Sequence, residues 1–238
     1  MSNENPSLVP EAACLYVVGT PIGNLADLSE RAISILSKVD CVACEDTRVT
    51  GLLFSRIGIK RPLIPYHDKN EANATNGLIQ RLKSGESVAI VSDAGTPAVS
   101  DPGFRIVREC RRQGITVVPV PGPCAFTTLL SASGLPTDSF LYMGFLPPKS
   151  AARIRFLEKH KDYKRTIALY ESCHRIEKFM NEMEKTLGPD RVICIGRELT
   201  KKFETIHSGK IVDIRPQFDQ GSKKGEFVVL IAPANYEL

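Results

Sequence analysis

The chain has 238 residues and a formal net charge of +4 at pH 7. Its length exceeds the roughly 100–150 residues of a usual single domain, so we expect two modest domains with separate cores. No apolar run approaches the ~18 residues of a membrane helix, and Met1–Glu11 is polar without the apolar stretch of a secretory leader. These features predict a soluble, cytoplasmic protein with no membrane partner.

The first half alternates strand-like and helix-like segments, which is typical of parallel βαβ units. Strands are predicted at Leu15–Gly19, Val39–Cys44, Leu63–Tyr66, Val88–Val91 and Ile115–Val120. Helices are predicted after the capping-box sequence Asp27–Glu30 and at Thr50–Ile57, Ala72–Lys83, Phe104–Gln113 and Ala125–Ala132.

The stretch from Val88 to Gly103 is the most informative part of this half. A buried strand ends in the polar sequence Ser92–Pro97, where Asp93 supplies a fixed charge. Asp101 suits a helix N-cap, with Pro102 at the first helical position. An ordinary strand-to-helix connection has a similar composition, but this loop is longer than such a connection needs. We therefore interpret it as a ligand-facing loop.

Polar or glycine-containing turns also follow the strands that end near Val18, Cys44 and Val120. In a parallel sheet these turns lie with the Val91 loop at one edge, where α/β proteins bind ligands. A dinucleotide site is not supported, because no G-x-G-x-x-G motif is present. Cys41 and Cys44 form a C-x-x-C pattern, but no second ligand pair follows, so we expect no metal site and interpret both as buried thiols.

The second half is predicted to form a mixed sheet, because it has fewer helices and closes with strands in sequence. The break at Ser133–Asp138 places the domain boundary between residues 134 and 135, giving domains 1–134 and 135–238. The predicted elements are strands at Phe140–Leu146, Arg165–Tyr170, Arg191–Gly196 and Glu226–Ala232 and a helix at Ile176–Leu187.

Basic residues gather between Lys149 and Arg165. Such a run is often a solvated helix face, and lysines alone would favour that interpretation. Two arginines, Arg153 and Arg155, lie two residues apart just after a proline-held loop. Their presence makes contact with a phosphate backbone as well supported as a solvated helix face.

Several motifs together resemble the ribosomal RNA small subunit methyltransferase I family, which belongs to the tetrapyrrole methylase superfamily. The motifs occur in the family's order from Leu15 to Ile231. They are Gly19–Leu25, Glu45–Arg48, Ser92–Pro97 with Ser100–Gly103, Pro121–Pro123, Gly144–Pro147, Tyr170–Ser172 with His174–Arg175, and Arg197–Lys201. The resemblance implies two α/β domains, with a parallel sheet in the first, a mixed sheet in the second and S-adenosylmethionine in the cleft between them. It also implies 2′-O methylation of a cytidine ribose in the decoding region of 16S ribosomal RNA, with that RNA or the small ribosomal subunit as partner, and a homodimer.

Carried over by motif, the implied cofactor contacts are Pro21, Ile22, Asp93, Thr96, Cys124, Ala125, Tyr170, Gly196 and Arg197. Predicted RNA contacts are Arg48, Arg153, Arg155, Arg175 and Lys202. A group that helps to remove the proton of the ribose hydroxyl would accelerate transfer. The candidates for this catalytic role are His67, Glu171 and Lys201, with Asp46, His174 and Glu198 also considered.

The chain departs from the family in two places. Cys124 stands where relatives usually have serine, which exchanges a hydroxyl for a weakly hydrogen-bonding thiol. Many relatives also carry a small helical domain beyond the last strand, whereas this chain ends at Leu238, a departure that concerns RNA recognition. Two alternatives remain: a methyltransferase of the same superfamily that acts on a tetrapyrrole, another small molecule or a protein, and a non-catalytic RNA-binding ribosome-assembly factor.

Overall fold

The computed structural model describes residues 9–238, so most of the polar amino-terminal stretch lies outside it. The chain divides into two compact units, the first ending at Cys124 and the second beginning at Ala125. This division precedes helix α5 (Ala125–Ala132), whereas the boundary expected at 134/135 would follow it. The difference arises because α5 packs on strands β7 and β10 of the second unit.

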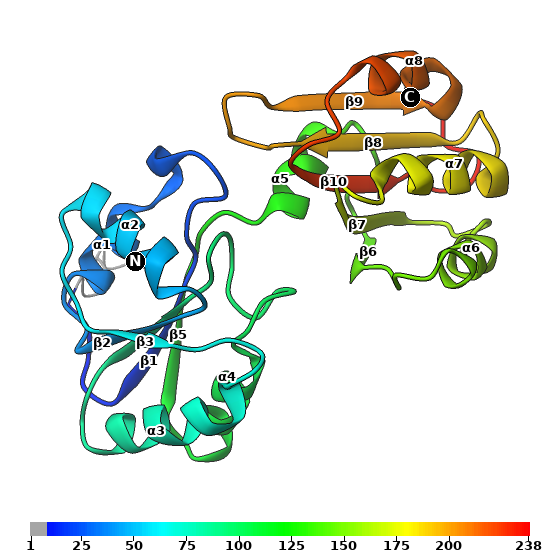
Figure 1. Cartoon of the computed structure of the whole chain (residues 1–238). Coiled ribbons are helices and arrows are strands. Elements are labelled where there is room, and N and C mark those ends of the chain that lie inside the picture. The colour runs from blue at the N-terminus through cyan, green and yellow to red at the C-terminus, as the bar shows by residue number, and fades with distance from the viewer. Residues whose placement is uncertain (1–8) are drawn as a thin grey trace, which may run out of the picture. The chain divides into compact units, whose positions relative to one another are not determined.

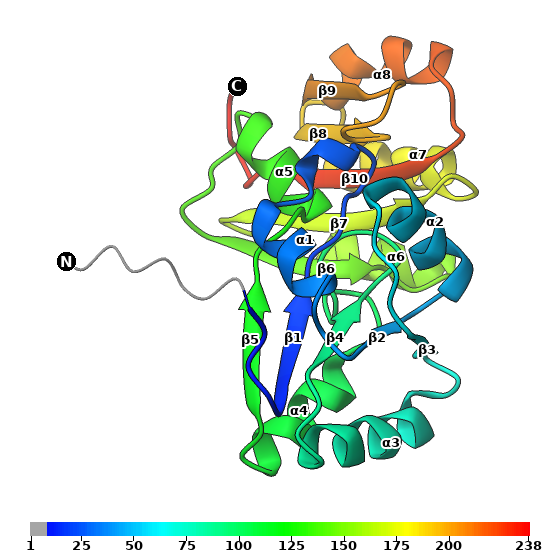
Figure 2. The same ribbon diagram turned by 90° about the vertical axis from the view of Figure 1, so that its left-hand side faces the viewer.

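The first unit is built on a parallel sheet with strand order β3-β2-β4-β1-β5. Figure 2 shows the arrows of β5, β1 and β4 pointing the same way. The strands are β1 (Cys14–Val18), β2 (Cys41–Cys44), β3 (Leu63–Pro65), β4 (Val88–Val91) and β5 (Thr116–Val120). The two edge strands each contain a proline, Pro65 in β3 and Pro119 in β5.

Helices cover both faces of this sheet, with α1 and α2 on one side and α3 and α4 on the other (Figure 1). They are α1 (Glu30–Leu36), preceded by a short 3-10 helix at Leu25–Asp27, α2 (Thr47–Ile57), α3 (Glu71–Lys83) and α4 (Phe104–Arg112). Both faces are buried, and Cys44 faces the α1 side while Cys41 faces the α3 side. Burial raises the pKa of both thiols, as suits core residues.

The second unit contains a mixed sheet with strand order β6-β7-β10-β8-β9. Only β6 and β7 are parallel neighbours, and the other pairs are antiparallel. The strands are β6 (Phe140–Phe145), β7 (Thr166–Ser172), β8 (Val192–Arg197), β9 (Thr205–Lys210) and β10 (Glu226–Ile231). The remaining helices are α6 (Ser150–Lys159), α7 (Ile176–Leu187) and α8 (Ile211–Gln220).

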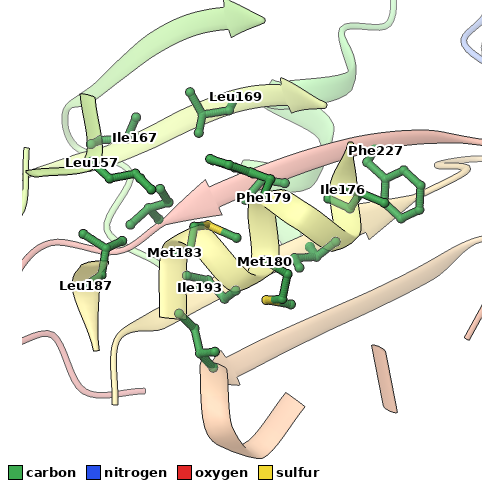
Figure 3. Packing of buried hydrophobic residues seen from close by; sticks show 14 of the residues in the cluster. Leu157, Ile167, Leu169, Ile176, Phe179, Met180, Met183, Leu187, Ile193 and Phe227 are labelled. Carbon is green, nitrogen blue, oxygen red and sulfur yellow. The ribbon is translucent and has the colours of Figure 1, made fainter. Parts of the chain in front are cut away.

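Helix α7 supplies much of the second core. Phe179, Met180 and Met183 are fully buried and pack against Leu169 of β7 and Ile193 of β8 (Figure 3). Every second residue of the central strands points to this cluster, which is the alternation expected of a pleated sheet. None of the helices in the described residues has the length and apolarity needed to cross a bilayer.

The predicted parallel and mixed sheets are confirmed, with differences at the element ends. Helix α2 begins at Thr47 rather than Thr50, because the Asp46 side chain accepts a hydrogen bond from the Arg48 N–H and caps the helix. Asp101 is not the N-cap of α4; that position belongs to Gly103, which has a φ of 136° and no capping side chain. Strand β9 and helix α8 were not predicted.

Candidate active site

The loops that follow β1 and β4 are joined by hydrogen bonds. Thr20 and Gly95 exchange two of them, from the Thr20 N–H to the Gly95 carbonyl at 2.8 Å and from the Gly95 N–H to the Thr20 carbonyl at 3.1 Å. The buried Thr20 hydroxyl also donates to the Ser92 carbonyl at 3.2 Å. The predicted cofactor residues on these loops therefore share one end of the sheet.

The loop after β5 meets the same region through a very close backbone approach. The Gly19 N–H donates to the Val120 carbonyl at 3.2 Å, and a Cβ added to Gly122 would lie 2.7 Å from the Gly19 Cα. Only glycine at both positions permits this separation. The Thr96 hydroxyl donates to the Pro123 carbonyl at 3.0 Å, which joins the β4 and β5 loops. The predicted convergence of the β1, β4 and β5 turns is confirmed.

The loop after β2 joins the group through Asp93. The Asp46 N–H donates to Oδ1 of Asp93 at 3.0 Å. No described residue donates to Oδ2 of Asp93, so this oxygen is available to a ligand. Burial raises the pKa of the Asp93 carboxyl, and the nearby Asp46 charge adds to the effect.

Further carboxylates make this end of the sheet acidic. Burial, opposed by a hydrogen bond with Ser92, raises the pKa of Asp101 to about 6, and repulsion from Glu45, Asp93 and Asp68 contributes to the shift. Burial followed by repulsion from Asp93 also raises the pKa of Glu45. No group of three or more ligand-type side chains within residues 9–238 is arranged to hold a metal ion. This end of the sheet therefore gathers four carboxyl groups, those of Glu45, Asp68, Asp93 and Asp101.

We expect the stability of the Asp101→Asn variant to depend less on pH than that of the parent protein. A carboxyl whose pKa rises from 3.8 to about 6 on folding binds its proton more tightly in the folded state. It therefore lowers stability progressively as pH rises through that interval, and the loss is complete above it. Thermal unfolding from pH 4 to pH 7 should show a smaller decline for Asp101→Asn. Parallel curves for the two proteins would contradict the assignment.

Tyr170, at the carboxyl end of β7, lies in an aromatic cluster of the second unit. Its ring centroid is 5.6 Å from the ring of Tyr142, 5.6 Å from that of Phe145 and 6.4 Å from that of Phe126. Phe126 and Tyr142 are stacked at 4.2 Å. These contacts fix the orientation of the Tyr170 ring.

Gly196 has a packing reason to be glycine. A Cβ at this position would lie 2.7 Å from a methyl group of Leu129 and 2.9 Å from one of Leu199. The side chain of the next residue, Arg197, donates to the carbonyls of Lys224 at 2.6 Å and Phe203 at 3.0 Å. The Arg197 guanidinium therefore holds its own loops together, which leaves chiefly the backbone for the predicted cofactor contact.

Glu171 is buried and paired with Arg175. Its Oε1 lies 2.7 Å from a guanidinium nitrogen of Arg175 and accepts the N–H of Ser172 at 2.7 Å. Arg175 also donates to the Leu146 carbonyl at 3.4 Å. Oε2 of Glu171 is buried without a hydrogen-bond partner among the described residues. Arg175 is thus a structural partner of Glu171 as well as a predicted RNA contact.

Arg153 does not contact solvent, and its prediction as an RNA contact is wrong. Its side chain is 1% exposed and forms two hydrogen bonds of 2.7 Å with Glu182, one to each carboxylate oxygen. The same guanidinium donates to the carbonyls of Pro147 at 3.3 Å and Pro148 at 2.8 Å. Burial alone would raise the pKa of Glu182, but the hydrogen bonds from Arg153 and Ser150 outweigh it and lower that pKa.

Lys201 is also committed to ion pairs. Its ammonium lies 2.9 Å from Oε1 of Glu198 and 2.8 Å from Oε2 of Glu226. Burial would lower the pKa of Lys201, but hydrogen bonds to these two carboxylates outweigh burial and raise it. Lys201 therefore stays protonated and is unsuited to act as a base, although its charge remains.

The matches of the whole chain to known proteins agree with this geometry. The family model described as Tetrapyrrole (Corrin/Porphyrin) Methylases matches residues 14–215. The chain belongs to this family.

Two curated relatives are similar to this tetrapyrrole methylase family member over most of its length. The protein named Ribosomal RNA small subunit methyltransferase I from Pasteurella multocida is 48% identical over 91% of this chain and 78% of its own length. The protein of the same name from Haemophilus influenzae is also 48% identical, over 91% of this chain and 77% of its own. The resemblance stated from the motifs is therefore confirmed.

A solved structure shows the same fold at low identity. The uroporphyrin-III-C-methyltransferase of Thermus thermophilus aligns with a TM-score of 0.64 and 22% identity, covering 92% of this chain and 94% of that one. The tetrapyrrole methylase fold, with its parallel and mixed sheets, is thereby established for the chain.

Enzymes of this family transfer methyl groups from S-adenosylmethionine, and that cofactor is assigned to this chain. The loops of the first unit fit such a group. Oδ2 of Asp93 can accept a hydrogen bond from a hydroxyl or an ammonium group. The neighbouring carboxylates of Glu45 and Asp101 favour a ligand that carries positive charge, as a sulfonium does. The individual cofactor contacts all stay predictions; they are Pro21, Ile22, Asp93, Thr96, Cys124, Ala125, Tyr170, Gly196 and Arg197.

The side chains predicted to contact RNA differ in their exposure and in the ion pairs that they already form. Arg155 and Lys202 are exposed on the second unit. The Arg48 side chain is 88% exposed, but it is held against Asp46 at 2.6 Å. Both residues lie at the start of α2, so an incoming phosphate would compete with Asp46 for the Arg48 guanidinium.

His67 follows β3 and is half-buried at the acidic end of the first sheet. Its backbone N–H donates to the Asn70 side chain at 2.8 Å, while no described residue hydrogen-bonds its ring. Its charge acts on Glu45, so the two side chains are electrostatic neighbours. Of the three predicted catalytic residues, His67 alone has a side chain without a hydrogen bond or ion pair to the described part of the chain.

The motifs did not indicate the roles of Glu182 and Asp101. The sequence does contain one indication that Arg153 has a buried partner such as Glu182. Arg153 lies four residues before the buried Leu157, so the helical repeat places both on the same face of α6. A charged residue on a buried face predicts a buried partner of opposite charge.

Proposed function

We propose that this chain methylates small-subunit ribosomal RNA, with the 2′-hydroxyl of a cytidine in the decoding region as the acceptor. The observation that carries the proposal is 48% identity over 91% of the chain to proteins named Ribosomal RNA small subunit methyltransferase I. The exposed basic residues Arg155 and Lys202 offer charge for a phosphate backbone and support it further. The acceptor atom and nucleotide rest on the motif resemblance.

Methyl transfer to a hydroxyl is an in-line displacement, so the chain's main task is to align the two reactants and exclude water. S-adenosylmethionine supplies an electrophilic methyl group on a sulfonium when it is bound. We propose that Asp93 orients it through Oδ2, with Pro21, Ile22, Thr96 and Cys124 around it. His67 then accepts the proton of the ribose hydroxyl, and the Glu45 carboxylate stabilises the imidazolium that forms.

The assay uses purified protein, S-adenosylmethionine with a labelled methyl group, and two substrates: small ribosomal subunits and naked 16S RNA from cells that lack this activity. We expect label in the RNA at one cytidine, resistant to alkaline cleavage at its 3′ side because the ribose is methylated. Label on a base, or only on protein, would contradict the 2′-O proposal. Cofactor binding without transfer to any tested RNA would favour a tetrapyrrole, another small molecule or a protein as substrate. No binding of the cofactor at millimolar concentration would leave the non-catalytic assembly factor.

We expect His67→Ala to lower the turnover number by roughly 100- to 10,000-fold with little change in cofactor affinity, because it removes the proton acceptor. The matched control is His207→Ala, since His207 lies in the edge strand β9 with its ring beside Gln217 and belongs to none of the predicted sites. Measurement at saturating cofactor and RNA isolates the chemical step. Equal turnover of His67→Ala and the parent protein would remove His67 from the mechanism, and attention would then turn to Glu171.

We further propose that the protein acts in the cytoplasm, where ribosomal subunits are found, and that it is a homodimer. Light scattering on the purified chain tests the second point. A homodimer has a mass of about twice 26.2 kDa.

A further inference from the structure

The loop from Glu198 to Glu204, between β8 and β9, has an unusual backbone. Glu198 and Thr200 have positive φ angles of 51° and 64°, although neither is glycine. Residues other than glycine rarely adopt a positive φ unless the surrounding structure imposes it, and residues with this strained backbone cluster at functional sites. The Thr200 N–H donates to a carboxylate oxygen of Glu204 at 2.5 Å, which closes the loop on itself.

Charged side chains anchor the loop at its base. Lys201 bridges Glu198 and Glu226, and Oε1 of Glu198 also accepts the Glu226 N–H at 3.0 Å. The Arg197 guanidinium donates to the Phe203 carbonyl at 3.0 Å. The backbone of Phe203 is therefore fixed before any ligand arrives.

The ring of Phe203 is presented outwards from this rigid base. Phe203 is 66% exposed, and the Lys202 ammonium lies 5.5 Å from its ring centroid. Lys202 is itself exposed. A single exposed apolar residue is ordinary on a protein surface. An exposed aromatic ring on an anchored backbone, with an ammonium group beside it, is more specific, because it offers a stacking face together with charge for a phosphate.

We propose that Phe203 stacks on an unpaired nucleobase of the RNA substrate while Lys202 contacts an adjacent phosphate. The inference rests on the proposed function and adds to it a recognition element outside the residues assigned to the cofactor. Single-stranded segments present unstacked bases to aromatic side chains, whereas a duplex hides them. This loop therefore binds single-stranded rather than double-helical RNA.

Kinetics of two variants test the stacking. Phe203→Ala should raise the KM for RNA roughly 5- to 150-fold, the range expected for the loss of one stacked base, with kcat at saturating RNA and cofactor affinity little changed. Phe203→Tyr keeps an aromatic face and should stay within about twofold of the parent KM. An unchanged KM for Phe203→Ala would overturn the proposal. If the parent protein transfers no methyl group to RNA, the proposed function itself fails and the fluorescence titration still tests the loop.

That titration uses the fact that the chain has no tryptophan. Phe203→Trp introduces a single fluorophore, and Val212→Trp is the control, since Val212 is 48% exposed on α8, a helix that carries none of the predicted cofactor, RNA or catalytic residues. A short ribo-oligocytidylate should quench Phe203→Trp strongly, and an abasic strand of the same length should not. Equal quenching by both strands, or no quenching by either, would overturn the stacking. Quenching of Val212→Trp to the same extent would also overturn it, since contact would not be confined to this loop.

Discussion

Gly122→Ala is expected to lower the free energy of unfolding by about 1–3 kcal/mol, the usual cost of forcing an extra methyl group into a filled space. The added Cβ would lie 2.7 Å from the Gly19 Cα and 2.9 Å from the Gly19 carbonyl oxygen. Backbone atoms cannot rotate away, so the loops after β1 and β5 must separate. Because both loops carry proposed cofactor contacts, turnover should fall roughly 100-fold, as misplacement by about an ångström can cause.

Gly77→Ala is the matched control for this change. Gly77 lies in α3, and no heavy atom other than the adjoining backbone of its own helix lies within 4 Å of the position its Cβ would take. Alanine has the higher helix propensity, so stability should rise by about 0.5–1 kcal/mol with activity unchanged. Chemical denaturation and cofactor titration check both variants. Full cofactor affinity in a folded Gly122→Ala protein would show that the close approach does not shape the site.

Arg153→Ala is expected to destabilise the second unit by about 3–5 kcal/mol, because it leaves the Glu182 carboxylate buried without its partner. Glu182 is 6% exposed and would retain only the Ser150 hydroxyl, at 2.5 Å, as a hydrogen-bond donor. The carbonyls of Pro147 and Pro148 would also lose their donor. Urea denaturation followed by circular dichroism measures the loss.

Arg155→Ala provides the control on the same helix. Arg155 is exposed, so its removal should change stability by no more than about 0.5 kcal/mol. A second check replaces both buried partners with apolar residues, as in Arg153→Met with Glu182→Leu. This pair should recover much of the lost stability, since no charge is then left buried. Equal stability of Arg153→Ala and Arg155→Ala would contradict the buried ion pair.

The sequence was most informative where local patterns decide structure. The strands of the first sheet and the turns after Val18, Cys44, Val91 and Val120 could be placed because buried parallel strands are apolar throughout and end at glycine or acidic residues. Their meeting at one edge follows from parallel topology. The contact between Gly19 and Gly122 could not be foreseen, because it depends on the register of β1 against β5.

The main errors have three causes: a buried partner that is distant in the sequence, an exposed edge strand and a proline within a helix. Arg153 and Arg155 look alike in the sequence, but they lie on different faces of α6, and the partner of the first comes from α7. Strand β9 lacks apolar alternation because most of its residues are exposed or half-buried at a sheet edge. Helix α8 was missed because Pro216 lies inside it, which usually indicates a break.

The prolines in the edge strands of the first sheet affect how molecules of this protein behave at high concentration. A bare strand edge can template hydrogen bonding with a neighbouring chain and so start aggregation. Pro65 and Pro119 each remove an N–H group from an outer strand of this sheet. Accidental strand addition is thereby discouraged along both borders of the sheet, so we expect the concentrated protein to resist assembly through these edges.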